Sequence, residues 1–116
     1  MGAQIIYANE FEERHRSLAS REVTELERIG GGIFNMSYAS CEELKADCAK
    51  LGVASELWPD YIETDGYDIP LQELREKNQK LHSIIAGLSP NERMSVKWLD
   101  KIHDILDSGM LFYICH

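Results

Sequence analysis

The segment MLFYICH, residues 110–116, decides how this sequence is interpreted. Residues 110–115 form an apolar run rich in aromatic and branched side chains, which is typical of a buried strand. Cys115 and His116 are adjacent, and neighbouring residues of a strand point to opposite faces. They are therefore poorly placed to act as a nucleophile and its base. We predict that this segment is a strand that completes a hydrophobic core.

Two further short strands are predicted at Gln4–Ala8 and Ile33–Tyr38. The remaining chain shows apolar residues at helical spacing, and we predict helices over about 9–28, 40–51, 68–88 and 90–108. The glycine run at residues 30–32 fits a helix stop and turn, since it matches no phosphate-loop pattern. Strands near both ends with helices between them predict an α+β, helix-rich fold with about four helices and a small sheet. An all-α domain is the alternative.

Capping signals sharpen the helix boundaries. Ser40 and Glu43 have the spacing of a capping box, as do Ser89 and Glu92. Gly52 and Gly109 supply the stops for the helices that follow these two serines. The last two helices are joined by a tight turn and should pack as an antiparallel pair.

Composition places the chain among soluble proteins. It has 116 residues, enough for a single globular domain over residues 1–116. Its apolar runs are too short to cross a membrane, and its N-terminal residues lack the pattern of a signal peptide. The three cysteines are widely spaced, which favours reduced, buried thiols. We expect a cytoplasmic protein without membrane contacts.

No pattern of catalytic, cofactor or metal-binding residues emerges, so we expect neither an enzyme nor a metalloprotein. Cys41 and Cys48 share a helix face but lie two turns apart, roughly 10 Å along the axis, too far for one zinc ion. The acidic stretch after Glu56 has the wrong register for a calcium loop. The antiparallel helix pair would allow His82 and His103 to face each other, which leaves one candidate histidine site open.

The informative feature is the distribution of charge. The chain carries 20 acidic and 12 basic residues, a net charge of −8. Residues 41–76 hold ten of the acids and three of the bases, and no basic residue occurs between Lys50 and Arg75. Such a surface disfavours direct binding to nucleic acid and favours a basic partner.

Aromatic residues are interleaved with the acids of this stretch. Carboxylates accept bidentate contacts from arginine, and tyrosine and tryptophan supply anchors at protein interfaces. Asp65–Gly66 is a hairpin signal, but pairing across it would oppose two acids, so we expect a loop. We predict a partner-binding surface formed by Glu56, Trp58, Asp60, Tyr61, Glu63, Asp65, Tyr67 and Asp68.

These features predict a small acidic binding protein that neutralises or regulates a basic protein partner by surface occlusion. Immunity proteins and antitoxins that act on nuclease toxins have this physical profile of size, charge and aromatic–acidic patterning. The alternative is a self-associating helical adaptor or homodimer without catalytic activity. Its basis is a heptad-like stripe with one polar member, Asn78. The stripe is short for a coiled coil, so we expect it to pack in a helix pair within the chain, with Asn78 near the surface. The stripe consists of Leu71, Leu74, Asn78, Leu81, Ile85 and Leu88.

Overall fold

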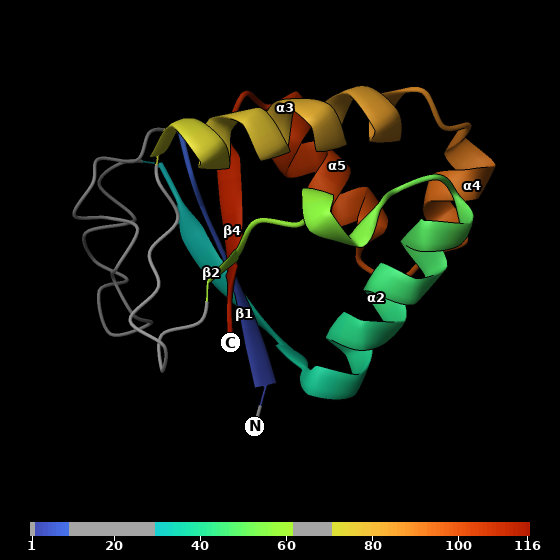
Figure 1. Ribbon diagram of the computed structural model, residues 1–116, viewed down its shortest axis with the longest axis horizontal. Coiled ribbons are helices and arrows are strands. Elements are labelled where there is room, and N and C mark those ends of the chain that lie inside the picture. The colour runs from blue at the N-terminus through green and yellow to red at the C-terminus, as the bar shows by residue number, and fades with distance from the viewer. Residues whose placement is uncertain (1, 10–29, 62–70) are drawn as a thin grey trace.

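The computed structural model describes residues 2–9, 30–61 and 71–116, with the side chain of Tyr61 excepted. Figure 1 shows a small sheet with helices packed around it. The described elements are, in chain order, β1 (Gly2–Ala8), β2 (Gly32–Ser37), α2 (Tyr38–Lys50), the 3₁₀ helix η3 (Ser55–Leu57), β3 (Asp60–Tyr61), α3 (Leu71–Ala86), α4 (Pro90–Met94), α5 (Leu99–Asp107) and β4 (Leu111–Cys115). Residues 10–28 of the predicted helix over 9–28, the predicted loop at residues 65–66 and the predicted helix start at 68 lie outside the described residues.

The sheet has the strand order β2-β1-β4-β3. β1 pairs antiparallel with both β2 and β4, so the two strands nearest the ends of the chain lie side by side at its centre. The short β3 adds a parallel pairing on the outer edge of β4, with Asp60 opposite Ile114. The α+β, helix-rich prediction is confirmed, and the MLFYICH segment supplies a core strand as expected.

The two faces of the sheet bury different residues because strand side chains alternate. On one face, Ile5, Phe112 and Ile114 join the main core with apolar residues of α2, α3 and α5. On the other face, Ile6 and Tyr113 form a smaller cluster with the first turn of α3. No described helix is long and apolar enough to cross a membrane.

Helix α3 reaches both clusters by crossing the outer edge of β4. Leu74 packs in the smaller cluster, whereas Leu81 and Ile85 pack in the main core. Asn78 lies between them and is 1% exposed, so the prediction that it lies near the surface is wrong. Since Leu74, Asn78, Leu81 and Ile85 are all buried within this chain, the stripe presents no free apolar face to a second helix.

The capping predictions have mixed outcomes. Ser89 forms the predicted capping box with Glu92 at the start of α4. The prediction for Ser40 is wrong: Ser37 is the N-cap of α2, and its hydroxyl accepts from the Ser40 N–H at 3.0 Å. Because β2 leads directly into α2, the helix begins at Tyr38, and the predicted strand end at this residue is wrong by one position. Gly52 has a φ of 96°, consistent with the predicted helix stop.

Trp98 divides the helix that we predicted over 90–108 into α4 and α5. It precedes α5 with a φ of 76°, a left-handed conformation that costs an L-residue roughly 1–2 kcal/mol. Its ring stacks on Phe34 of β2 with 5.5 Å between ring centroids. The sequence does not reveal this break because it depends on a contact 64 positions away along the chain.

Glycines 30 and 31 form the turn into β2. Gly30 has a φ of 72°, which glycine adopts without strain. At Gly31 a Cβ atom would lie 2.0 Å from the backbone oxygen of Tyr7, so a side chain there would clash with β1. The glycine run therefore has a structural role in bringing β2 against β1.

Candidate functional site

The C-terminal end of β4 lies at an open hollow beside α2. Its volume is about 330 Å³, and we call it the α2 hollow. It is lined by Tyr38, Glu42, Lys45, Asp60 and His116. These residues come from the first eight positions of α2, from β3 and from the residue after β4.

Lys45 and Asp60 meet because α2 packs against the sheet with Cys41, Leu44 and Cys48 facing the core. Lys45 follows Leu44 and lies at the rim of that core, where a long side chain can cover apolar surface and keep its charge in water. The Lys45 ammonium lies 2.8 Å from each carboxylate oxygen of Asp60. The two side chains are 18% and 28% exposed, so this pair is partly shielded from solvent.

His116 completes the cluster around Asp60. Its Nε2 atom lies 2.8 Å from the Oδ1 atom of Asp60. An ionised carboxylate can only accept a hydrogen bond, so Nε2 carries the hydrogen in this contact. Asp60 thus accepts from two donors, which share its Oδ1 atom, and its position is fixed by groups that are distant in sequence.

Cys41 lies near the charged residues of the hollow but does not line it. It is fully buried. Burial raises the pKa of the Cys41 thiol; the nearby Lys45 opposes this effect, and Asp60 and Glu42 add to it. A cysteine nucleophile requires a lowered pKa and access to solvent, so Cys41 is unsuited to that role.

The eight residues of the predicted partner-binding surface differ in where they lie in the structure. Glu56 is exposed in η3, and Asp60 lines the α2 hollow. Tyr61 lies in β3 with its backbone opposite Cys115. Glu63, Asp65, Tyr67 and Asp68 lie outside the described residues.

Trp58 requires a correction. It is 1% exposed and packs edge-on against Phe112 in the main core, with 6.5 Å between ring centroids. The gain from burying so large an aromatic surface explains this placement. Trp58 therefore supports the sheet from within and presents no surface to a partner.

Four residues of the hollow were not predicted from sequence: Tyr38, Glu42, Lys45 and His116. Residues 38, 42 and 45 have the spacing of one helix face, which is a usable signal. It was missed because we placed the helix start at Ser40, which left Tyr38 outside the helix. His116 left no signal, because its contact with Asp60 joins residues 56 positions apart.

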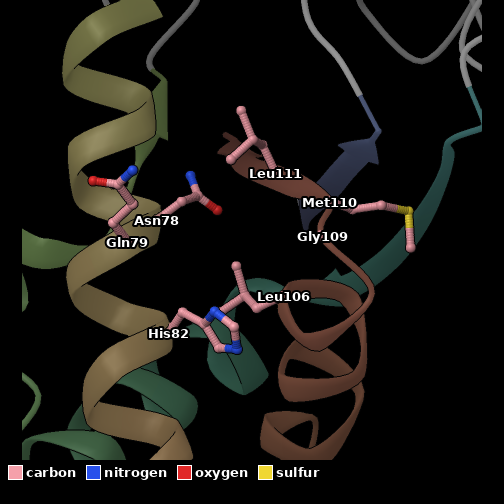
Figure 2. A pocket seen from close by; sticks show the side chains of 7 residues that line it. All are labelled: Asn78, Gln79, His82, Leu106, Gly109, Met110 and Leu111. Atoms are coloured by element: carbon pink, nitrogen blue, oxygen red, sulfur yellow. The ribbon is translucent and has the colours of Figure 1, made fainter.

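A second, smaller hollow of about 170 Å³ lies between α3 and the turn that joins α5 to β4. We call it the α3 groove, and Figure 2 shows Asn78 pointing from α3 toward the start of β4. The groove is lined by Asn78, Gln79, His82, Leu106, Gly109, Met110 and Leu111. His82 approaches Asp107, with 3.6 Å between Nε2 and Oδ1, so its nearest charged neighbour on α5 is this aspartate.

His103 belongs to a different group, with its ring nitrogen near the carboxylates of Asp100 and Asp104 on the same face of α5. The ligand atoms of these three residues lie within 4.8 Å of one another. The group is largely exposed, and such carboxylates commonly occur without an ion. The two histidines that we considered as one site therefore have separate acidic neighbours.

Comparison with protein families, with curated proteins and with solved structures finds no match for this chain.

Proposed function

We propose that this chain is a small acidic binding protein that recognises a basic protein partner, with the α2 hollow at the centre of the contact. The observation that carries the proposal is the position of Asp60. This predicted contact residue opens into a hollow beside an exposed tyrosine, Tyr38, and an exposed carboxylate, Glu42. Exposed tyrosine beside acidic groups is suited to a surface rich in arginine and lysine.

The charge around the hollow supports the same role. Glu42 and Glu43 are exposed on α2, and Glu56 is exposed in η3. No ion pair forms at these three carboxylates with any other described residue. Carboxylates of this kind steer a positively charged partner and can raise association rates by about 10–10³-fold.

Occlusion of a basic partner's surface would neutralise a protein that acts on nucleic acid, such as a nuclease toxin. An immunity protein or antitoxin in the cytoplasm works in this way. The proposed role is binding alone, without catalysis, metal or cofactor.

Capture from a lysate of the source cells at low and high salt tests the proposal, with charge reversal at one site. Wild-type protein, Glu42→Lys and Glu76→Lys are compared as baits. Both substitutions change the net charge equally, but Glu76 is exposed on α3 and does not line the hollow. We expect a basic protein to bind wild type and Glu76→Lys, to be lost from Glu42→Lys, and to be weakened by salt.

Bound proteins are identified by mass spectrometry, and circular dichroism confirms that each bait is folded. Equal capture by the two variants would contradict the placement of the contact at the α2 hollow. A partner that is retained at high salt and is itself acidic would contradict the electrostatic basis of the proposal.

A further inference from the structure

The α2 hollow carries one negative charge that its own residues leave uncompensated. The Lys45 ammonium neutralises the Asp60 carboxylate, and His116 bonds to that same carboxylate. Glu42 also lines the hollow, and it makes no ion pair with another described residue. A bound group with a single positive charge would balance the hollow.

The acceptors of the hollow are arranged so that one position remains open. A carboxylate has about four lone-pair sites. Asp60 uses two on Oδ1, for Lys45 and His116, and one on Oδ2, for Lys45. Among the residues that the structure describes, this leaves one site on Asp60 and the whole carboxylate of Glu42 without a partner. A ligand with several N–H donors in a fixed fork can use both residues at once.

Tyr38 supplies the third element of the site. Its side chain lines the hollow and is 58% exposed, which is unusual for a large aromatic residue in this structure. A flat cation can stack on such a ring. The volume of about 330 Å³ lies at the lower end of the range for ligand pockets, roughly 300–1,000 Å³, and suits one long side chain.

We propose that the α2 hollow binds an arginine side chain of the partner. The guanidinium group bridges Glu42 and the free acceptor of Asp60 and stacks on Tyr38. Lys45 and His116 act as positioning residues that hold the Asp60 carboxylate in place. Arginine fits better than lysine because guanidinium is planar, carries five donors and is more weakly hydrated than an ammonium group.

This inference rests on the proposed function, since it names the chemical group through which the basic partner is recognised. The test uses the whole chain and a small probe, N-acetyl-arginine amide, with N-acetyl-lysine amide as the comparison. Backbone amide shifts are followed by NMR during titration. We expect the arginine probe to shift the signals of Tyr38, Glu42, Lys45, Asp60 and His116, and to bind several-fold more tightly than the lysine probe.

Matched variants locate the site. Glu42→Gln removes the uncompensated charge, and we expect the arginine probe to bind about tenfold more weakly. Glu43→Gln makes the same change at the next position on α2, outside the hollow, and should leave the affinity unchanged. Tyr38→Phe keeps the stacking ring and should retain binding, whereas Tyr38→Ala should lose it.

Either of two results would overturn the inference: no shift at the hollow residues at saturating probe, or equal affinities for the two probes. Neither result depends on a partner protein, so the salt-sensitive capture of a basic partner would still stand. Conversely, arginine binding in the hollow together with equal capture by Glu42→Lys and Glu76→Lys would remove the proposed function alone.

Discussion

Two sets of polar contacts lie along the outer edge of β4, and they differ in their exposure to solvent. At its start, the N–H and C=O of Phe112 are both bonded to the side-chain amide of Asn78, at 3.1 and 3.0 Å. At its end, Ile114 donates to the backbone oxygen of Pro59 at 2.9 Å, and His116 contacts Asp60. The first arrangement is buried, whereas His116 and Asp60 of the second line the α2 hollow.

The buried arrangement seals the sheet. The N–H groups of Phe112 and Ile114 face the same edge, because backbone direction alternates along a strand. The short β3 does not extend to Phe112, and Asn78 occupies the position that a further strand residue would fill. The amide also donates to Leu74 O at 2.8 Å, so both its nitrogen and its oxygen are used.

The contacts at the α2 hollow leave some hydrogen-bond acceptors of the described residues unused. Considering the described part of the chain, Asp60 keeps one free acceptor site in the α2 hollow and Glu42 has no ion-pair partner there. A polar side chain whose hydrogen bonds are all formed within the protein stabilises the fold. One that keeps unused acceptors at the surface is available to bind a ligand. The following predictions test this contrast.

The largest effect is expected at Asn78. Asn78→Ala leaves the Phe112 N–H and C=O buried without partners, and we expect a loss of about 3 kcal/mol in the free energy of unfolding. Gln79→Ala, at the adjacent exposed position, should change it by less than about 0.5 kcal/mol. Urea unfolding measures both values. Similar stabilities for the two variants would show that the amide does not hold the strand edge.

A smaller effect is expected at Asp60. Asp60→Asn weakens contacts to Lys45 and His116, but water can replace them because the side chains are partly exposed. We expect a loss of about 1 kcal/mol or less in the free energy of unfolding. The same substitution should abolish arginine binding to the hollow, measured by the NMR titration. A loss as large as that for Asn78→Ala would place Asp60 among the structural residues.

Salt should separate the two sites further. Between low ionic strength and about 1 M salt the Debye length falls to about 3 Å, which screens exposed charges. The destabilisation caused by Asp60→Asn should therefore shrink in salt, whereas that caused by the neutral Asn78→Ala should not. The measurement is the difference in unfolding free energy between each variant and wild type at both salt concentrations. If salt reduced the destabilisation by Asp60→Asn and by Asn78→Ala equally, the distinction between an exposed and a buried site would be wrong.

The smallest effect concerns the two thiols of α2. Burial raises the pKa of Cys48 to about 12, and it also raises that of Cys41, where Lys45 opposes the rise. Both folded pKa values lie above the ordinary thiol pKa of 9.0, so this contribution to stability is complete below pH 9 and declines as the pH rises, toward about 12 in the case of Cys48. At pH 8 we expect both thiols of the folded protein to resist iodoacetamide.

Mass spectrometry after alkylation measures this resistance, with the urea-unfolded protein as the control. Lys45→Met should raise the pKa of Cys41 further and leave that of Cys48 unchanged, because only Cys41 lies near the charges of the hollow. Rapid modification of Cys48 in the folded protein would contradict its placement in the core.

Local signals in the sequence predicted the elements well where the cause is local. The Ser89 capping box and the stops at Gly52 and Gly109 depend on residues within one turn, and the structure contains them. The helix start at Ser40 was placed wrongly because Ser37 has a competing cap signal only three positions earlier. Trp98 was missed because its left-handed backbone accompanies a stacking contact with a distant strand.

The candidate site was predicted only in part for the same reason. Acidic and aromatic composition indicated Asp60, but composition does not say which aromatic ring is exposed. Trp58 entered the core and Tyr38 remained outside, because the packing of η3 and α2 against the sheet decides which surface is covered.

The sequence by itself determined the α+β class, the core strand at MLFYICH, the buried face of α2 and the concentration of negative charge in the middle third. Only the tertiary structure decided that Asn78 closes a strand edge and that Lys45, Asp60 and His116 form one cluster. The physical reason is separation along the chain. Periodicity and capping arise within a few residues, whereas these contacts join residues 15 to 56 positions apart.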